Sequence, residues 1–268
     1  MLIVDSQVHI WAADSPERPW PPIVHPGQSR PHRPQPITED DMLREMKVAG
    51  VDRVVIAPPV WEGVRNDIAL VAAREHPDRF AVMGRVDLND PASRALIPTW
   101  RAQPGMLGLR YAFHRPTVRP LLIEGRIEWL WPAAEAAGVP IMLFTLAEDL
   151  HLVDSIAVRH PALKLSIDHL GLTGGKDEAA FRDFDKLLAL AARPNIAVKA
   201  SCLPAYTTEA YPYRSLHPYL RRAYDAFGPR RMFWGSDLSR LPCTYRECVT
   251  MSNPAGSTER ACTPREHR

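Results

Sequence analysis

The chain has 268 residues, of which 46% are hydrophobic and 24% charged, and its formal net charge is +2. This length and composition suit one large α/β barrel, or two ordinary domains, with a sizeable core. The arginines are scattered rather than gathered into a basic run, which argues against a nucleic-acid partner. No apolar stretch reaches the roughly 18 residues that a membrane span requires.

The N-terminal segment and the cysteines both favour a cytoplasmic protein. The N-terminus has the pattern of a strand that contains Asp5, and it lacks the charged and then apolar pattern of a signal peptide. The four cysteines form no Cys-x-x-Cys pair and have no zinc-finger spacing, so we expect reduced thiols.

Eight short runs of β-prone residues alternate with helical segments. The first run carries polar residues at alternate positions, and Gln7 and His9 fall on the same face. Because a buried polar group needs a partner, we expect both side chains to point into a site. The predicted strands are 2–8, 53–57, 80–86, 106–110, 140–145, 163–167, 196–200 and 232–234.

Capping residues and apolar spacing predict the helices between these strands. Thr38 caps a helix that stops at Gly50, and Asp90 stands before a proline at the first position of another. Residues 176–192 place Phe and Leu at spacings of three and four, which predicts one amphipathic helix.

The order of the elements predicts the fold class. Strands that alternate with helices imply parallel pairing in an α/β protein. Eight strands are the number that closes a (β/α)8 TIM-type barrel, whose active sites lie at the C-terminal ends of the strands. A doubly wound sheet is the alternative, but no Gly-x-Gly-x-x-Gly follows the first strand, which disfavours its dinucleotide-binding form.

Two segments depart from this pattern. Residues 12–36 hold eight prolines and form a long Pro-rich loop that either covers the active site or wraps the surface. After Asp237 only a short helix, 245–251, is predicted, so the barrel domain, 1–251, has an incomplete C-terminal helix. We expect 252–268, SNPAGSTERACTPREHR, to be a disordered or aberrant tail, for instance from a shifted reading frame. Apolar surface near the first and last strands would then stay exposed.

Polar residues collect where the predicted strands end. Asp237, after strand eight, can take a proton from water beside an ester carbonyl and later return it to the leaving oxygen. The carbonyl then needs polarisation by His169 or by cationic side chains. Arg110 and Lys199 could do this or bind a substrate carboxylate, and Arg240 is a further anion-binding candidate.

Four stretches at these strand ends resemble a known family. VDSQVHIW, GLRY, IDHLG and FWGSDLSR, in this order, are similar to the amidohydrolase-2 (amidohydrolase-related) family of the amidohydrolase superfamily. Its lactonase-like branch, with 2-pyrone-4,6-dicarboxylate hydrolase and fuconolactonase relatives, resembles the chain over roughly residues 1–250. The resemblance implies that His9 matches the second histidine of a first-strand His-x-His, His169 the strand-six histidine, and Asp237 the strand-eight aspartate that activates water.

Gln7 departs from the family pattern, because it stands where the first histidine would be. An amide is a poor ligand for transition metals, and Thr145 occupies the end of strand five without a histidine or glutamate to compensate. A two-metal centre is therefore not expected. The resemblance implies either that no metal is required or that at most one weakly bound divalent ion, zinc or manganese, binds through His9 and Asp237.

The other histidines are expected to serve the structure. His76 and His160 stand between a helix and the next strand, where an imidazole can meet the last carbonyls of the helix. Four others are expected in loops or at the surface, although two of them, His25 and His114, could line the pocket. This group is His25, His32, His114 and His217.

The sequence thus predicts a hydrolase that opens a lactone, or a related cyclic ester, of a small carboxylated substrate. Catalysis is assigned to Asp237, His169 and His9. Substrate binding is assigned to Gln7, Arg110, Lys199 and Arg240. The alternatives are a metal-dependent non-oxidative decarboxylase of an aromatic acid, and a catalytically impaired or binding barrel. The expected partner is a small molecule rather than nucleic acid or a membrane. The sequence also allows a homo-oligomer.

Overall fold

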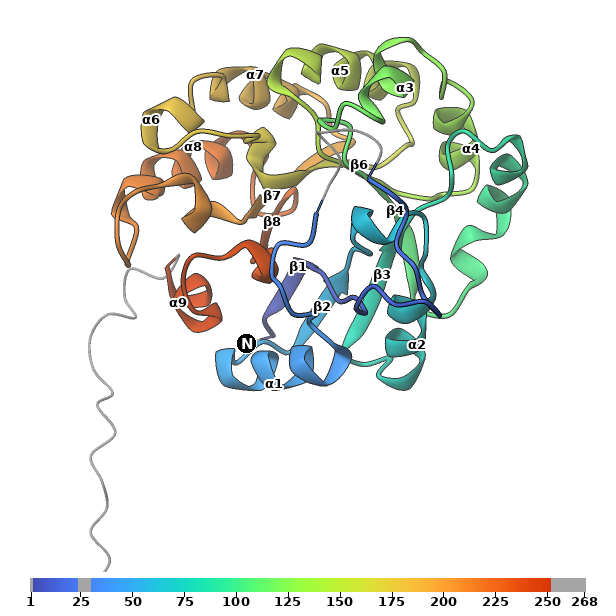
Figure 1. Ribbon diagram of the computed structural model, residues 1–268. Coiled ribbons are helices and arrows are strands. Elements are labelled where there is room, and N and C mark those ends of the chain that lie inside the picture. The colour runs from blue at the N-terminus through green and yellow to red at the C-terminus, as the bar shows by residue number, and fades with distance from the viewer. Residues whose placement is uncertain (1, 24–29, 252–268) are drawn as a thin grey trace, which may run out of the picture.

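The strands form a TIM-type barrel. A computed structural model describes residues 2–23 and 30–251. Eight parallel strands follow one another around the sheet in chain order, with the helices outside them (Figure 1). The predicted (β/α)8 architecture is confirmed, and the doubly wound alternative is wrong. The strands are β1 Val4–Val8, β2 Arg53–Ile56, β3 Phe80–Gly84, β4 Met106–Tyr111, β5 Ile141–Leu143, β6 Leu165–Ile167, β7 Ile196–Ser201 and β8 Met232–Gly235.

The helices surround the barrel, and the sequence signals at their ends operate as predicted. Thr38 and Asp41 form a reciprocal capping box at the start of the first helix, which ends at Gly50 with a φ of 77°. Asp90 accepts a hydrogen bond from the backbone N–H of Ala92, at 2.9 Å, and so caps a 3-10 helix, η2 Pro91–Ala102. The α-helices of the described chain are α1 Glu39–Ala49, α2 Asp67–Glu75, α3 Arg119–Ile123, α4 Leu130–Ala136, α5 Leu150–Arg159, α6 Asp177–Ala180, α7 Phe184–Ala189, α8 His217–Phe227 and α9 Tyr245–Thr250.

The single helix predicted over 176–192 is wrong. The structure divides the segment into α6, a short turn, α7 and a final 3-10 turn. The break lets two aromatic rings share one partner on α8. Phe181 stacks on Tyr219 with ring centroids 3.6 Å apart, whereas Phe184 meets the same ring edge-on at 5.7 Å. Packing of these rings outweighs the helical period of the sequence.

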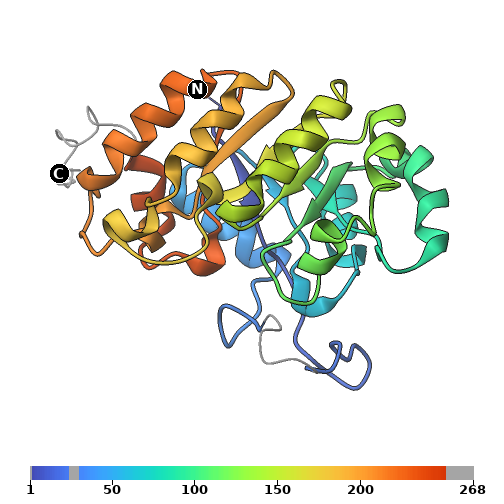
Figure 2. The same cartoon turned by 90° about the horizontal axis from the view of Figure 1, so that it is seen from above.

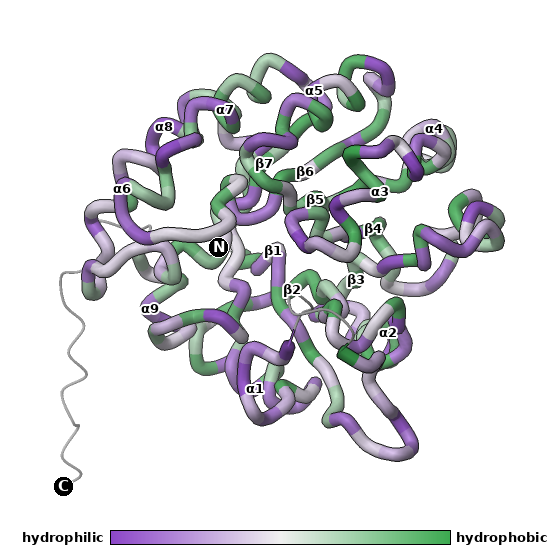
Figure 3. Tube along the Cα trace, turned by 45° about the horizontal axis from the view of Figure 1, so that its top comes forward, coloured by the Kyte–Doolittle hydropathy of each residue, from purple (hydrophilic) through white to green (hydrophobic). Residues whose placement is uncertain are grey.

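Hydropathy follows the layers of the barrel. The helices alternate between hydrophilic and hydrophobic residues (Figure 3), as expected where one face packs on the strands and the other meets solvent. Most of the buried apolar side chains form one continuous core cluster. Within the described residues, no helix combines the length and the apolar character needed to cross a membrane.

A buried carboxylate joins the two ends of the sheet. Asp5 on β1 accepts hydrogen bonds from the backbone N–H of Ser236, just after β8, at 2.9 Å and from the hydroxyl of Tyr245 on α9 at 2.7 Å. It also accepts from the Ser236 hydroxyl and from the backbone N–H of Gln7. Beside it, the N–H of Asp237 donates to the carbonyl of Gln7 at 2.9 Å. These bonds close the barrel between β8 and β1.

The last helix covers little of this seam. α9 is six residues long and contacts α1 through Arg246, whose Nη1 donates to the carbonyl of Ala49 at 2.8 Å. An apolar groove of about 950 Å³ runs along β1, β8 and α8, and Leu2 and Phe233 on it are 57% and 44% exposed. The expected exposed apolar surface is therefore found among the described residues. The predicted tail, 252–268, lies outside them.

The described parts of the Pro-rich loop, 12–23 and 30–36, project from one side of the barrel (Figure 2). Arg18 binds both carboxylate oxygens of Asp67, at 2.6 and 2.9 Å, and its Nε donates to Glu62 at 3.1 Å. Arg33 donates to the carbonyls of Leu238 and Ser239, at 2.7 and 3.1 Å, just beyond the end of β8. One described part of the loop is therefore anchored to α2, and the other is anchored just beyond the end of β8.

We predict that Asp5→Ala weakens the fold severely. Removing the carboxylate leaves the N–H of Ser236 and the hydroxyls of Ser236 and Tyr245 buried without an acceptor, which should lower the free energy of unfolding by about 3–5 kcal/mol. Urea denaturation measures the loss. Asp78→Ala, at an exposed aspartate, is the control and should change stability by less than about 0.5 kcal/mol. Equal stability of the two variants would contradict a closing role for Asp5.

Candidate functional site

Residues from several strand ends and from the Pro-rich loop enclose one cavity at the C-terminal mouth. Its volume is about 30 Å³. Five of the seven sequence-predicted site residues line it, whereas Gln7 and Lys199 do not. The cavity is lined by His9, His32, Val60, Trp61, Arg110, Ala112, His114, Arg115, Phe144, His169, Asp237 and Arg240.

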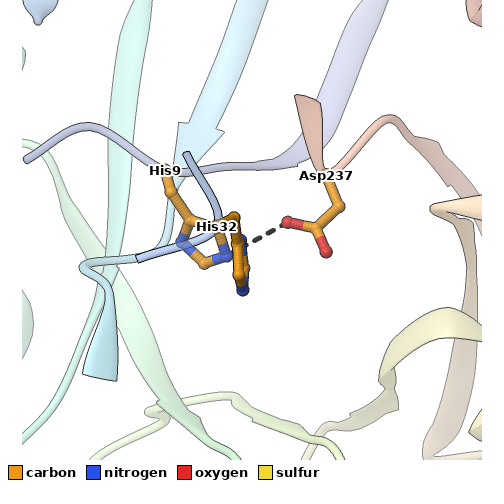
Figure 4. Close-up of side chains that lie close together, drawn as sticks. All are labelled: His9, His32 and Asp237. Carbon is orange, nitrogen blue, oxygen red and sulfur yellow. Dashed lines mark ion pairs between the residues drawn. The ribbon is translucent and has the colours of Figure 1, made fainter. Parts of the chain in front are cut away.

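His9 and Asp237 face each other at the seam between the first and last strands. His9 Nε2 lies 3.1 Å from Asp237 Oδ1 (Figure 4). The other ring nitrogen of His9, Nδ1, lies 2.5 Å from the carbonyl of Ala57 and donates its hydrogen to it, because a carbonyl oxygen only accepts. A singly protonated His9 therefore directs a lone pair at a carboxylate. Such a pair requires a cation between the two groups, either a second proton on the ring or a metal ion.

His32, from the Pro-rich loop, completes this cluster; it was expected in a loop or at the surface, without a part in the site. Ligand atoms of His9, His32 and Asp237 all lie within 4.8 Å of one another (Figure 4). The His32 ring is bonded through Nδ1 to the hydroxyl of Ser239 at 2.8 Å. Burial, together with the neighbouring His9, lowers the pKa of His32 to about 3. The ring is thus neutral at pH 7 and offers a lone pair.

These three side chains fit a metal ion. Asp237 Oδ1 is buried and makes no aligned hydrogen bond, although His9 is close. Two donors of a tetrahedral zinc ion at about 2.0–2.2 Å lie roughly 3.3–3.6 Å apart, and the 3.1 Å between His9 Nε2 and Asp237 Oδ1 is close to this separation. Two imidazoles and a carboxylate form a donor set typical of zinc and manganese.

The carboxyl group of Asp237 is held ionised. Burial opposes its charge, but the contacts with His9 and Arg240 prevail and keep its pKa well below the usual range. His169 Nε2 lies 3.7 Å from Asp237 Oδ2, and Arg240 Nη1 lies 3.8 Å from the same oxygen. Asp237 is therefore available at neutral pH to accept a proton.

The backbone is strained where the last three strands end. His169, Cys202 and Asp237 follow β6, β7 and β8, and their φ angles are 52°, 60° and 53°. A non-glycine residue in this left-handed region costs about 1–3 kcal/mol and persists where its surroundings hold it. Such residues concentrate at functional sites, and two of these three line the cavity.

A charged network lies beneath the cavity. Asp168 is fully buried and shared by two cations, with its Oδ1 2.7 Å from Lys199 Nζ and its Oδ2 2.9 Å from Arg110 Nε. Burial raises its pKa, but Lys199 and Arg110 outweigh that effect and lower it. Gln7, also fully buried, accepts a hydrogen bond from Lys199. The polar groups of Gln7 and Lys199 thus contact one another and other residues below the cavity, and they do not line it.

One lining residue, Arg115, was missed by the sequence analysis. Its Nε is buried and has no hydrogen-bond partner, so this donor is available to a ligand. The residue follows β4 by four positions in the stretch Ala112-Phe113-His114-Arg115, and only its nearness to the predicted strand end could have indicated it. His114 lines the cavity as the sequence allowed, whereas His25 lies outside the described residues.

The chain resembles known proteins over most of its length. The family described as Amidohydrolase matches residues 4–252. An L-fucono-1,5-lactonase of Burkholderia ambifaria is 31% identical over 253 residues, covering 89% of this chain and 81% of that protein.

Two solved structures share the fold. An amidohydrolase from Burkholderia multivorans with bound zinc has a TM-score of 0.74 at 22% identity, covering 94% of this chain and 90% of that one. A probable 2-pyrone-4,6-dicarboxylic acid hydrolase from Acinetobacter baumannii with bound citric acid has a TM-score of 0.67 at 17% identity, covering 94% and 91%. The match over nearly the whole chain and the lactonase relative together establish that this protein belongs to the amidohydrolase family.

Proposed function

We propose that this protein hydrolyses a lactone, or a related cyclic ester, of a small carboxylated acid. The observation that carries the proposal is the buried, ionised carboxylate of Asp237 in one cavity with Arg110, Arg115 and Arg240. A carboxylate that can accept a proton, beside groups that attract an anionic oxygen, suits attack of water on an ester. The relationship to the Burkholderia ambifaria protein, which is named a lactonase, supports this reaction class.

The proposed reaction uses Asp237 twice. The oxygen of a water molecule forms a bond to the carbonyl carbon of the lactone, while Asp237 accepts one of the water protons. The ring C–O bond then breaks, and Asp237 returns the proton to the leaving alkoxide oxygen. The product is the open-chain hydroxy acid, and Asp237 is ionised again for the next cycle.

The three arginines at the cavity differ in their partners. Arg110 is held by Asp168 at 2.9 Å, so its charge is partly balanced before a substrate binds. Arg115 has a buried Nε without a partner, and this donor fits a substrate carboxylate. Arg240 lies 3.8 Å from Asp237, close to where negative charge develops on the carbonyl oxygen. We therefore assign Arg115 to substrate binding and Arg240 to stabilisation of the oxyanion.

One divalent ion, zinc or manganese, is proposed to bind between His9, His32 and Asp237. A bound ion of this kind would supply Lewis-acid polarisation of the carbonyl. The residues present argue against a second ion. The amide oxygen of Gln7 is directed to Lys199, and Thr145, two residues beyond the end of β5, stands where a histidine or carboxylate ligand would be needed. His32 adds a third ligand to the two that the sequence predicted.

We predict that Asp237→Asn folds normally but loses turnover by roughly 100-fold or more, because an amide cannot act as the base. The measurement is product release on a panel of carboxylated lactones, with Asp78→Asn as the control. Normal turnover by Asp237→Asn would assign water activation elsewhere. Release of CO₂ from an aromatic acid, without lactone hydrolysis, would replace the proposal with the decarboxylase alternative.

We also predict that Arg115→Met raises KM for a carboxylated lactone by about 10- to 100-fold and leaves kcat nearly unchanged, because a charge-assisted hydrogen bond contributes about 1.5–3 kcal/mol. A neutral lactone of the same ring size is the matched comparison. An equal rise in KM for both substrates would show that Arg115 does not bind the carboxylate.

A third prediction concerns the metal. Titration of the metal-free protein with zinc should reach at most one ion per chain and should raise Tm, because the ion binds the folded state. His32→Ala should abolish most of this rise, whereas His151→Ala, at an exposed histidine on α5, should retain it. Two tightly bound ions, or an unchanged response in His32→Ala, would contradict the three-residue site.

A further inference from the structure

Three buried side chains form a chain of contacts across the barrel interior beneath the cavity. They are Lys199 of β7, Gln7 of β1 and His169, which follows β6, and none is more than 1% exposed. The Lys199 ammonium donates to Gln7 Oε1, and Gln7 Nε2 lies 3.3 Å from His169 Nε2. The three residues come from distant parts of the sequence, so only the barrel brings them together.

The chemistry of Lys199 fixes the orientation of the Gln7 amide. An ammonium group has three donors and no acceptor. The Lys199 ammonium donates to Gln7 Oε1 and to the sulfur of Met142 at 3.3 Å, and it forms an ion pair with Asp168 Oδ1 at 2.7 Å. The amide must therefore turn its oxygen to Lys199 and its NH₂ to His169.

The orientation of Gln7 in turn fixes the proton of His169. An amide NH₂ only donates, so His169 Nε2 must accept and cannot carry a hydrogen. The single proton of the neutral ring then lies on Nδ1. That nitrogen is 2.8 Å from the hydroxyl of Ser201, which can accept it. Ser201 also contacts the backbone N–H of His169 at 3.3 Å, so the ring and its backbone are held by the same hydroxyl.

We propose that Lys199 and Gln7 are positioning residues that hold His169 as the Nδ1-protonated tautomer. Its Nε2, 3.7 Å from Asp237 Oδ2, then presents a lone pair and donates no hydrogen bond to that carboxylate. His169 therefore cannot give a proton to the ester carbonyl, and that role falls to the arginines at the cavity. The tautomer follows from the contacts alone, whereas its effect on turnover rests on the proposed function.

Nitrogen NMR of the full-length protein labelled with ¹⁵N-histidine tests the proposal without a substrate. The His169 signals are identified by their absence in His169→Asn. The wild-type protein at neutral pH should show the shift pattern of an Nδ1-protonated ring. A pattern for Nε2 protonation would overturn the proposal, whether or not any variant folds.

Gln7→Glu provides the decisive variant. The glutamate keeps the shape of the side chain and an oxygen for Lys199, but it presents an acceptor to His169 in place of the NH₂. The His169 proton should then move to Nε2, or the ring should gain a second proton. The control is Gln35→Glu at an exposed glutamine, which should leave the His169 signals unchanged. An unchanged His169 spectrum in Gln7→Glu would refute the positioning role of Gln7.

Kinetics on a lactone that the wild-type protein hydrolyses separates this proposal from the proposed function. A proton on His169 Nε2 would donate to Asp237 and weaken it as a base, so we expect Gln7→Glu to lower kcat by about 10- to 100-fold with KM changed by less than about threefold. If no lactone is hydrolysed, the proposed function fails while the NMR result still decides the tautomer. If lactones are hydrolysed and kcat is unaffected by Gln7→Glu, the positioning role fails alone.

Discussion

The hydrogen bonds to Asp5 set the relative position of the first and last strands, and the candidate site depends on that position. A buried carboxylate without partners would cost several kcal/mol, and four donors from Gln7, Ser236 and Tyr245 offset this. Because side chains alternate along a strand, a slip of one residue at this seam would turn His9 away from Asp237. The contact between His9 Nε2 and Asp237 Oδ1, at 3.1 Å, is made across the same seam.

Beneath the cavity, polar groups take the place of the branched apolar side chains that usually fill a TIM barrel. Asp168 balances Lys199 and Arg110 there, and Gln7 carries the influence of Lys199 to His169. A buried polar network is stabilising only when its members are satisfied, and then it permits few alternative arrangements. In our proposal, this network is what holds His169 as the Nδ1-protonated tautomer.

Much of the fold could be predicted from the sequence, because local signals act at short range. Runs of β-prone residues that alternate with helical segments indicated the eight strands, and Thr38 and Gly50 marked the ends of α1. The strand ends brought His9 and Asp237 under consideration because a parallel barrel gathers them at one mouth. The helix break near Phe181 could not be predicted, because it depends on Tyr219 of a later helix. The same holds for His32 and Arg115, whose places in the site depend on how loops fold back over the mouth.

The small size of the cavity has a consequence for the timing of catalysis. A volume of about 30 Å³ holds a couple of water molecules, whereas ligand pockets usually measure roughly 300–1,000 Å³. A lactone does not fit this volume, so part of the lining must move before one binds, and the loop around His32 and Arg33, bonded to Ser239 and Leu238, is one such part. Three hydrogen bonds hold it there, and at about 1 kcal/mol each they would leave the mouth open in about one molecule in a hundred. Productive encounters then fall by the same factor, so the association rate of the substrate would report the opening of the loop rather than diffusion.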